Sequence, residues 1–311
     1  MYLGLDIGSV SIKSAVVDDK GSIIEEHYIR TKGNIIAATK DILGLLKTKN
    51  VTGIATTGSA RKFISALITA DVSVDEITAH RTAVSKLYPK VRTIFEIGGQ
   101  DSKIIYFNDR NVNFEMNNVC AAGTGSFLDQ QAARLGLDLK EFCRLGLSAK
   151  EYHKIASKCT VFAETDMIHA QQSGVPLNKV IRGVHRGMVN NYFSQLCRGK
   201  TLEGAFLFEG GTSENPVLVQ EFSNKLIEIG LIKNRKQLIV PKPHNKTMGA
   251  IGAAMICLNK KLDNKRQVPK IKEYEVLEGQ KCNACNVKCG SSLTSIKVNG
   301  KVITIGRQCK E

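Results

Sequence analysis

The sequence predicts an α/β chain of two similar lobes, followed by a small cysteine-rich module at its C-terminal end. Three observations predict it: a strand–turn–strand pattern occurs twice, amphipathic helix patterns alternate with apolar strand patterns, and four of the nine cysteines crowd the tail. The chain has 311 residues, of which 42% are hydrophobic, and is therefore long enough to bury two cores.

The repeated pattern is a β-hairpin with a carboxylate and a glycine in its turn. Its first copy reads LGLDIGSVSIKSAVV and its second copy reads IFEIGGQDSKIIYF. Asp6 in the first copy matches Glu96 in the second, and Lys13 matches Lys103. Residues typical of tight turns follow each copy. A hairpin duplicated in this way predicts two similar lobes that face each other.

Both hairpin turns are predicted to bind phosphate, because glycine lets the backbone approach an anion closely and serine supplies hydroxyl and N–H donors. The residues assigned to the nucleotide from these turns are Asp6, Gly8, Ser9, Ser11, Lys13, Glu96, Gly98 and Gly99. The carboxylates of Asp6, Glu96 and Asp101 are expected to hold Mg²⁺, directly or through water. The sequence contains neither a Walker A pattern nor GxGxxG, which argues against a P-loop or Rossmann site.

A cysteine precedes a glycine-rich helix start in the stretch NNVCAAGTGSFLDQQAARLGL. Cys120 comes just before Gly123, Thr124 and Gly125, and an amphipathic helix pattern follows them. A helix start of this kind is typical of an anion site, because free backbone N–H groups point outward there. Gly123 and Thr124 are therefore added to the nucleotide-binding residues.

Two further glycine-rich segments are expected beside the nucleotide. In GAFLFEGGTSENPVLVQEF an apolar strand ends at Gly210 and Gly211, as in an adenosine-binding turn where larger side chains would block the base or the ribose. MGAIGAAMI is a small-residue helix in which Gly249 and Gly252 share one side. It is interpreted either as a tightly packed helix or as a hinge helix between the lobes, and Gly249 is counted as a nucleotide contact.

Charge and composition limit the partners of the chain. The net charge of +15 and the pI of 9.4 indicate either an acidic partner or a solvated lysine-rich surface, and no nucleic-acid motif accompanies the basic residues. Aromatic residues make up 6% and tryptophan is absent, which does not favour a surface for stacking carbohydrate or single strands. No apolar run approaches about 20 residues and the chain opens on a strand pattern, so we expect a cytoplasmic protein that binds neither membrane nor nucleic acid.

The tail places four cysteines around a predicted hairpin with Asn299-Gly300 at its turn: Cys282, Cys285, Cys289 and Cys309. Four cysteines around a small hairpin suit tetrahedral Zn²⁺, although CxxCxxxC also occurs in iron–sulfur sites. Structural Zn²⁺ is favoured over a second cluster. Unbound cysteines are disfavoured, because so small a module has little core of its own.

Three segments resemble one family of proteins: EIGGQDSK, NNVCAAGTGSFLDQQAARLG and SKCTVFAETDMIHAQQSGVP. They are similar to the ATPase activators (component A) of 2-hydroxyacyl-CoA dehydratases. That family includes the ATPase subunits of benzoyl-CoA reductase and belongs to the acetate kinase–sugar kinase–Hsp70–actin superfamily. The resemblance extends from about residue 1 to residue 257. It departs at Glu96, where the family more often has aspartate, and at 212–216, which we do not assign residue by residue.

The resemblance implies two ribonuclease H-like lobes, as in actin and Hsp70, with a nucleotide cleft between them. The first lobe is expected at 1–90 with a return helix at about 247–260, and the second lobe, which includes the cluster cysteines, at 91–246. A basic linker at 261–280 and the cysteine-rich module at 281–311 are expected to follow.

Cys120 and Cys159 each stand at the start of a predicted helix. The partial positive charge and free N–H groups there favour a thiolate and stabilise an anionic iron–sulfur cluster. Two cysteines cannot ligate a [4Fe–4S] cluster alone, but a two-fold dimer supplies each of them twice. The resemblance implies the same arrangement, one cluster shared by a homodimer. The scattered cysteines are expected to fill the core; they are Cys143, Cys197 and Cys257.

The function that the resemblance implies is that of an ATP-dependent one-electron reductase. Reduced ferredoxin or flavodoxin would be the donor, MgATP would change the conformation around the cluster, and a 2-hydroxyacyl-CoA dehydratase or related double-cluster reductase would accept the electron. Asp101, Gln100 and Glu164 are the candidates for orienting water or Mg²⁺ near the γ-phosphate. Two alternatives stay open: a small-molecule kinase with Asp101 as its base, and a regulator that uses ATP as a switch without iron.

Overall fold

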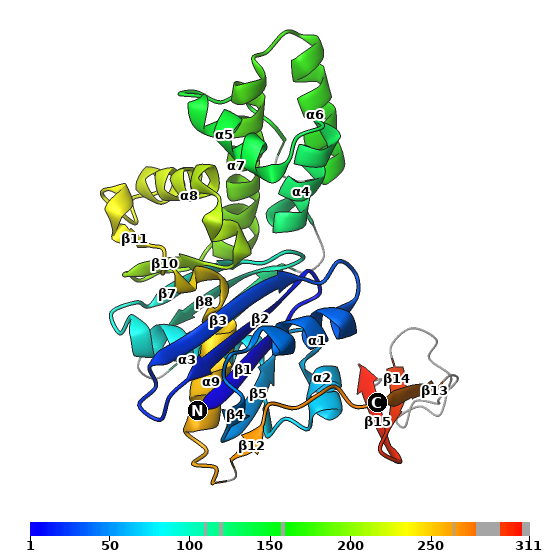
Figure 1. Cartoon of the computed structure of the whole chain (residues 1–311). Helices are drawn as coiled ribbons and strands as arrows, with labels where there is room; N and C mark the ends of the chain where they lie inside the picture. Colours follow the sequence, from blue (N-terminus) through cyan, green and yellow to red (C-terminus); the bar gives the residue numbers. More distant parts are fainter. Residues whose placement is uncertain (109–110, 118–120, 157–158, 264, 278–292, 307–311) are drawn as a thin grey trace, which may run out of the picture. The chain divides into compact units, whose positions relative to one another are not determined.

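The computed structural model describes residues 1–108, 111–117, 121–156, 159–263, 265–277 and 293–306. The chain forms two compact units, each with its own five-stranded sheet (Figure 1). Unit 1 comprises Met1–Ala83 and Gly249–Glu311, and unit 2 comprises Val84–Met248. The α/β class and the two-lobed organisation predicted from the sequence are confirmed.

The sheet of unit 1 has the strand order β3-β2-β1-β5-β6. The strands are β1 (Tyr2–Ile7), β2 (Ser11–Val17), β3 (Ile23–Arg30), β5 (Gly53–Thr57) and β6 (Val72–Ser73). The first three are antiparallel, whereas β5 runs parallel to β1 and β6 parallel to β5. Every residue of β1 and β5 is buried, as expected for strands that are covered on both faces.

The helices that belong wholly or partly to unit 1 are α1 (Ile35–Leu45), α2 (Arg61–Ile68), α3 (Glu76–Leu87) and α9 (Met248–Leu258). The boundaries between the units fall within α3 and at the first residue of α9. Helix α1 begins after Asn34, whose side chain accepts a hydrogen bond from Ala37 N at 2.9 Å. Ile42 of this helix packs with Leu3 and Leu5 of β1 in the core of unit 1.

Helix α9 packs very close to its neighbours within unit 1. A Cβ at Gly4 would lie 2.0 Å from the carbonyl oxygen of Ala250, and a Cβ at Gly252 would lie 1.8 Å from that of Ala79. Both glycines are therefore required by the close approach of β1 and α3 to α9. The sequence left two interpretations of this helix, a tightly packed helix and a hinge helix between the lobes, and both require such close packing.

The sheet of unit 2 repeats the topology of unit 1, with the strand order β11-β10-β7-β8-β9. Its strands are β7 (Thr93–Ile97), β8 (Ser102–Phe107), β9 (Val112–Asn117), β10 (Phe206–Glu209) and β11 (Leu238–Ile239). Again the first three are antiparallel, while β10 runs parallel to β7 and β11 parallel to β10. The predicted repeat is confirmed in its register, because Asp6 lies opposite Lys13 and Glu96 lies opposite Lys103.

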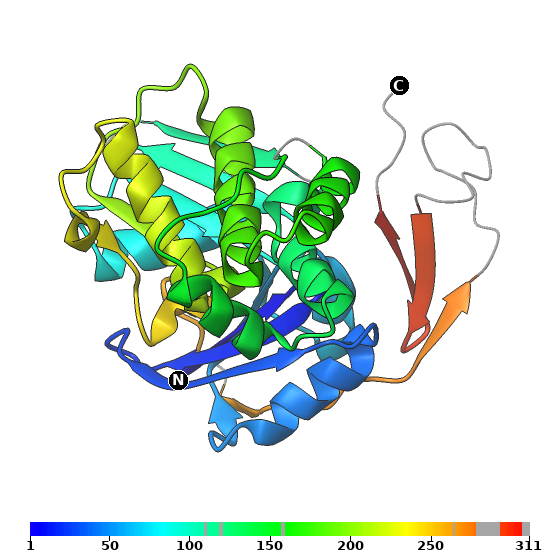
Figure 2. The ribbon, with the colours of Figure 1, turned by 90° about the horizontal axis from the view of Figure 1, so that it is seen from above.

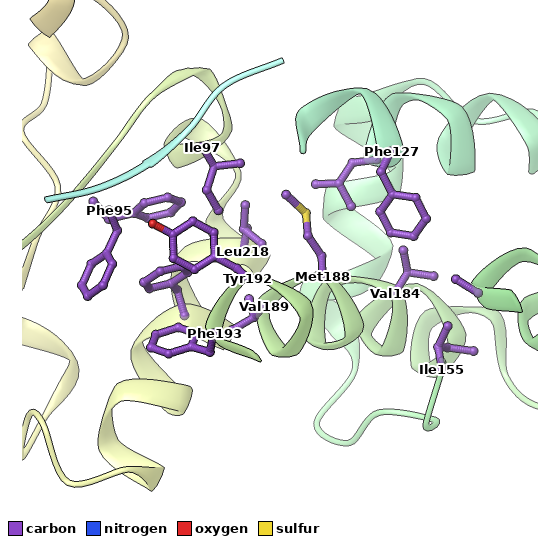
Figure 3. Packing of buried hydrophobic residues seen from close by; sticks show 14 of the residues in the cluster. Phe95, Ile97, Phe127, Ile155, Val184, Met188, Val189, Tyr192, Phe193 and Leu218 are labelled. Carbon is purple, nitrogen blue, oxygen red and sulfur yellow. The ribbon is translucent and has the colours of Figure 1, made fainter. Parts of the chain in front are cut away.

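The helices of unit 2 are α4 (Gly125–Arg134), α5 (Leu139–Ser148), α6 (Thr160–Gln172), α7 (Leu177–Tyr192) and α8 (Pro216–Glu228). Figure 2 shows α7 (green) and α8 (yellow) side by side over the strands of this unit. Helix α7 is buried along most of its length and packs against Phe95 of β7 through Tyr192, and toward Phe127 of α4 through Met188 (Figure 3). Tyr192 also donates its hydroxyl to the carbonyl oxygen of Lys103 at 2.5 Å, which ties α7 to β8.

After α9 the chain adds two short pieces of sheet to unit 1. They consist of β12 (Arg266–Gln267), which pairs with β4 (Asn50–Val51), and of an antiparallel sheet of β13 (Tyr274–Leu277), β14 (Leu293–Val298) and β15 (Lys301–Gly306). The predicted Asn299-Gly300 turn joins β14 to β15, and its residues have φ values of 48° and 78°. Tyr274 packs edge-to-face on Phe63 of α2, with ring centroids 5.7 Å apart.

The tail cysteines lie outside the described residues, so their metal site stays a prediction; they are Cys282, Cys285, Cys289 and Cys309. In the portions of the chain that the structure describes, no helix is long and apolar enough to cross a membrane.

Candidate functional site

Each unit places a carboxylate and a lysine together at the turn of its first hairpin. In unit 1 the Asp6 Oδ2 lies 3.0 Å from the Lys13 Nζ. In unit 2 the Lys103 Nζ lies 3.3 Å from the Glu96 Oε2 and 2.9 Å from the Asp101 Oδ1. Asp6, Glu96 and Lys103 are buried. Because a buried charge needs a partner, each lysine compensates the carboxylate beside it.

The two turns are closed by the same backbone hydrogen bond. Gly8 N donates to the carbonyl oxygen of Ser11 at 3.1 Å, and Gly98 N donates to that of Asp101 at 2.9 Å. A Cβ at Gly8 would lie 2.9 Å from the Ser11 carbonyl oxygen, and one at Gly98 would lie 3.0 Å from the Asp101 Oδ1. A side chain would be crowded at both positions, and glycine leaves the backbone there without one.

The tips of the turns contain the other predicted phosphate contacts. Ser9 and Gln100 are exposed, Gly99 is half-buried, and Ser11 is buried within the hairpin. Thr31 holds the tip of the first turn, because its hydroxyl donates to the carbonyl oxygen of Ser9 at 2.6 Å. Sequence reasoning missed Thr31, since no local pattern connects it with that turn.

The carboxylates at the turns suit Mg²⁺, which prefers oxygen ligands and keeps several of its waters. Within the described residues, no group of three or more His, Cys, Asp or Glu side chains could cage a metal ion. One or two carboxylates, completed by water and phosphate oxygens, form the ligand set expected for Mg²⁺ bound with a nucleotide. Asp6 in unit 1 and the pair of Glu96 and Asp101 in unit 2 fit such a set.

The predicted adenosine turn follows β10 and is fixed from two sides within unit 2. Gly210 has a φ of 94°, and a Cβ there would lie 2.5 Å from the carbonyl oxygen of Ile97. The backbone of β7 therefore requires glycine at this position, in addition to any room that a base or ribose needs. Gly211 begins a 3₁₀ turn, in which the Thr212 hydroxyl donates to the same Ile97 oxygen at 2.9 Å. On the other side, the carbonyl oxygen of Asn245 accepts from Gly210 N at 2.9 Å.

Gly249, at the start of α9, lies beside Asp6 within unit 1. A Cβ at Gly249 would lie 3.2 Å from the Asp6 Oδ2 and 3.2 Å from the His80 Nε2. His80 belongs to α3, is buried, and therefore shares the surroundings of Asp6. Sequence reasoning missed His80 as well, because a single histidine on a helix has no local pattern that marks it.

Both helices predicted from the cysteine motifs are present. Helix α4 begins after its N-cap residue Thr124, and Phe127 is buried on the predicted stripe. Helix α6 begins after its N-cap residue Cys159, whose side chain makes no capping hydrogen bond. It ends before Gly174, which has a φ of 73°. Cys120 lies outside the described residues.

The residues just before α4 are packed inside unit 2. Gly123 and Thr124 are both buried, and a Cβ at Gly123 would lie 3.4 Å from the Asn117 Nδ2. Both residues pack inside unit 2 just before α4 begins, and their contact with a nucleotide stays a prediction.

The surroundings of Cys159 combine a thiol with an apolar surface. Cys159 is a half-buried free cysteine, and the first-turn N–H groups of a helix have no partner within that helix. Such a thiol fits a ligand of an anionic group. Val161 and Phe162, in the first turn of α6, are each 65% exposed. Two large apolar side chains exposed together are typical of a contact surface.

Glu164 of α6 forms an ion pair with Arg134 of α4, which links the two helices. This contact gives Glu164 a structural partner that the sequence did not predict, and its role near a γ-phosphate stays a prediction. Gln100 and Asp101, the other two candidates for that role, both lie at the β7–β8 turn.

The scattered cysteines have the properties of packing residues. Burial raises the pKa of the Cys143 thiol to about 11 and the pKa values of the Cys197 and Cys257 thiols to about 12. These thiols stay protonated at neutral pH, which agrees with their assignment to the core.

Comparisons with known proteins give this geometry a context. The sequence profile of the BadF/BadG/BcrA/BcrD ATPase family matches residues 3–257. The chain is 34% identical over 264 residues to the activator of lactoyl-CoA dehydratase from Anaerotignum propionicum, with 82% of this chain and 96% of that protein covered.

Two solved structures resemble this fold. One is the crystal structure of (R)-2-hydroxyglutaryl-CoA dehydratase component A from Acidaminococcus fermentans, with a TM-score of 0.74 and 27% identity over 83% of this chain and 98% of that one. The other is the activator of the 2-hydroxyisocaproyl-CoA dehydratase from Clostridium difficile with bound ADPNP, with a TM-score of 0.71 and 29% identity over 84% of this chain and 95% of that one.

Proposed function

Because the chain belongs to the BadF/BadG/BcrA/BcrD ATPase family, we propose that it is an ATP-dependent activator that delivers single electrons to a partner enzyme. ATP hydrolysis would drive the transfer, and reduced ferredoxin or flavodoxin would supply the electrons. The acceptor would be a 2-hydroxyacyl-CoA dehydratase or a related double-cluster reductase. Relatives of the chain are named as activators of such dehydratases, and one as a subunit of benzoyl-CoA reductase.

The observation that best supports ATP use is the duplicated carboxylate–glycine–lysine turn. Asp6 in unit 1, and Glu96 with Asp101 in unit 2, would hold Mg²⁺ through oxygen atoms and water. Lys13 and Lys103 would offset the negative charge of phosphate groups placed nearby. A related activator was solved with bound ADPNP, an ATP analogue, which agrees with this assignment.

In ATP hydrolysis a water molecule attacks the γ-phosphorus and the bond from that phosphorus to the bridging oxygen of ADP breaks. Little covalent chemistry is required of the protein, which acts mainly by positioning groups and stabilising charge. Gln100, exposed at the tip of the second turn, is the side chain we assign to orienting that water. Asp101 is assigned to the metal beside it.

We further propose that Cys120 and Cys159 from each of two copies hold one [4Fe–4S] cluster, which stores and releases one electron at a time. Support comes from Cys159, a half-buried thiol at the N-cap of α6. The exposed Val161 and Phe162 support a second copy of this chain as the occupant of the adjoining surface. For the four tail cysteines, Zn²⁺ remains our proposal over a second cluster.

The kinase alternative has less support. A kinase on this fold would need Asp101 as a base, but its carboxylate is paired with the Lys103 ammonium at 2.9 Å and is assigned to the metal. Three relatives of the chain are named as activators of dehydratases.

The test is metal and activity analysis of the full chain purified without oxygen. We expect about four iron and four sulfide per two chains, together with Mg²⁺-dependent ATP hydrolysis. ATP binding without iron would instead support the regulator, and phosphate transfer to a small molecule would support the kinase. Zinc content, measured on the same sample, tests the tail.

A further inference from the structure

We propose that α4 and α6 are not equivalent, and that α4 alone transmits the state of the nucleotide toward the cluster through its first turn. The inference rests on the proposed function, because it takes the β7–β8 turn as a phosphate site. Its basis is a junction within unit 2 where three segments meet: the β7–β8 turn, the adenosine turn after β10, and the start of α4.

The first turn of α4 is hydrogen-bonded to the phosphate turn itself. Gly125 N donates to the carbonyl oxygen of Gly98 at 2.9 Å, and Ser126 N donates to that of Gly99 at 2.8 Å. First-turn N–H groups have no partner inside their own helix, so the phosphate turn satisfies these two. If the Gly98–Gly99 backbone shifts when phosphate binds, α4 must follow it or lose both hydrogen bonds.

The adenosine turn after β10 lies close to the same first turn of α4. A Cβ at Gly125 would lie 3.0 Å from the Thr212 Cγ2 and 3.1 Å from the Gly98 carbonyl oxygen. Thr212 is itself fixed, because its hydroxyl donates to the carbonyl oxygen of Ile97 at 2.9 Å. The helix start therefore lies against both nucleotide turns with little room for a side chain, so a displacement of either turn is passed to α4.

Helix α6 is anchored in another way. Asp166 Oδ2 accepts from Ala156 N at 2.7 Å, which ties α6 to the segment 149–156. That segment rests on α7: a Cβ at Gly183 would lie 2.0 Å from the His153 carbonyl oxygen, and the Arg182 guanidinium donates to the Ala149 carbonyl oxygen at 2.5 Å.

Helix α7 in turn is fixed to α8. Arg182 lies 2.7 Å from the Glu221 Oε1 as a buried ion pair, and His185 Nε2 lies 2.8 Å from the Asn215 Nδ2. Thus α6 reaches the nucleotide turns only indirectly, through α7 and α8, whereas α4 is hydrogen-bonded to the phosphate turn itself. A change of nucleotide therefore moves α4 relative to α6, and the Arg134–Glu164 ion pair between them must adjust.

Hydrogen–deuterium exchange on the full chain tests this, with and without the cluster. MgADPNP is expected to change exchange across 125–134 by about fivefold, the factor expected for one hydrogen bond, and across 160–172 by less than about twofold. Nucleotide binding is measured on the same samples by calorimetry, so that exchange is compared at known occupancy.

Gly125→Ala tests the steric part of the junction. The new Cβ should push α4 away from Thr212 and reduce the response of 125–134 to that of 160–172. Adding Thr212→Ser removes the methyl group and keeps the hydroxyl, so the double variant should regain most of the response. Gly44→Ala is the matched control, because Gly44 is a helical residue of α1 with nothing within 4 Å of an added Cβ.

The outcomes separate the inference from the proposed function. Saturable nucleotide binding with unchanged exchange at α4, or with equal changes at α4 and α6, overturns the inference and leaves the ATPase proposal intact. Failure to bind any adenine nucleotide overturns the proposed function, and the inference falls with it. If Gly125→Ala does not fold, the comparison of α4 with α6 in the unaltered protein still decides.

Discussion

The two units share one sheet topology, and in each of them a helix follows the third strand. The units differ in the length of chain between that strand and that helix. In unit 1, β3 ends at Arg30 and α1 begins at Ile35. In unit 2, β9 ends at Asn117, and α4, α5 and α6 intervene before α7, the counterpart of α1, begins at Leu177. Under the proposed function, nucleotide binding belongs to the repeated part of the fold, and electron transfer would belong to the insertion that includes Cys159.

The repeated turns are also unequal. The first has one carboxylate, Asp6, paired with Lys13, whereas the second has two, Glu96 and Asp101, that share Lys103. The backbone of the second turn is joined to the insertion through Gly125. The second copy therefore combines two of the proposed metal ligands with the connection to α4, whereas the first contributes one carboxylate.

The largest effect is expected in the insertion. Cys159→Ser should abolish bound iron, because serine at this N-cap would remove a proposed sulfur ligand of the cluster. Iron and sulfide analysis checks this, and nucleotide affinity should stay unchanged. Cys143→Ser, at a half-buried cysteine of α5, is the control and should retain iron. Full iron content in Cys159→Ser would contradict the assignment of the cluster to the insertion.

The repeated turns should respond in the opposite way. Asp6→Asn and Asp101→Asn should each lower Mg²⁺-dependent ATP hydrolysis by at least about 100-fold, because each removes a charged oxygen from the metal. Steady-state phosphate release measures the loss, and visible absorbance of the cluster should persist. If either variant keeps its ATPase rate, that copy of the turn does not hold the metal.

A pH experiment distinguishes the stabilities of the two units. Burial lowers the pKa of His185 in unit 2 from 6.5 to about 4. In its neutral ring, Nδ1 donates to the Ile181 carbonyl oxygen and Nε2 accepts from the Asn215 Nδ2, each at 2.8 Å. Between these two pKa values the histidine binds a proton in the unfolded chain but not in the folded one. The contribution of His185 to the free energy of unfolding is therefore complete above pH 6.5 and is lost, by about 3 kcal/mol, as the pH falls toward 4.

The corresponding loss in unit 1 should come at lower pH. Glu25 is a partly buried carboxylate, and burial, which alone would raise its pKa, is outweighed by hydrogen bonds that lower it from 4.5 to about 2. The free energy of unfolding of each unit can be measured with denaturant between pH 7.5 and 4. As the pH falls, we expect that of unit 2 to decrease first. His185→Gln should flatten the decline in that window, and an unchanged slope in this variant would assign it to another group.

The smallest effect concerns the surface of the insertion. Phe162→Ser should weaken self-association by about tenfold, since it removes a large apolar side chain that is 65% exposed. Sedimentation equilibrium measures the dimer constant. Ile24→Ser, which alters an exposed apolar residue of β3 in unit 1, is the control and should leave the constant unchanged. Equal losses in both variants would contradict an interface at α6.

Local patterns account for the features that the sequence could predict. The hairpins, the starts of α4 and α6 and the Asn299-Gly300 turn each depend on a few adjacent residues, and the structure confirms them. His80 beside Asp6 and Thr212 against Gly125 depend on contacts between distant segments, which no local spacing marks. The same is true of the Arg134–Glu164 ion pair, which gave Glu164 a partner that its motif did not show.

Helix α9 has a consequence for the order of synthesis. It is made after the whole of unit 2, yet its Ala253, Ala254 and Cys257 fill a core with Tyr2 and Val17 of unit 1. While the ribosome is still producing unit 2, the first sheet therefore lacks the helix that covers it. Because domains tend to fold as they emerge from the ribosome, unit 2 can fold before unit 1 is complete. The face of the first sheet that α9 covers stays exposed until α9 has been synthesised.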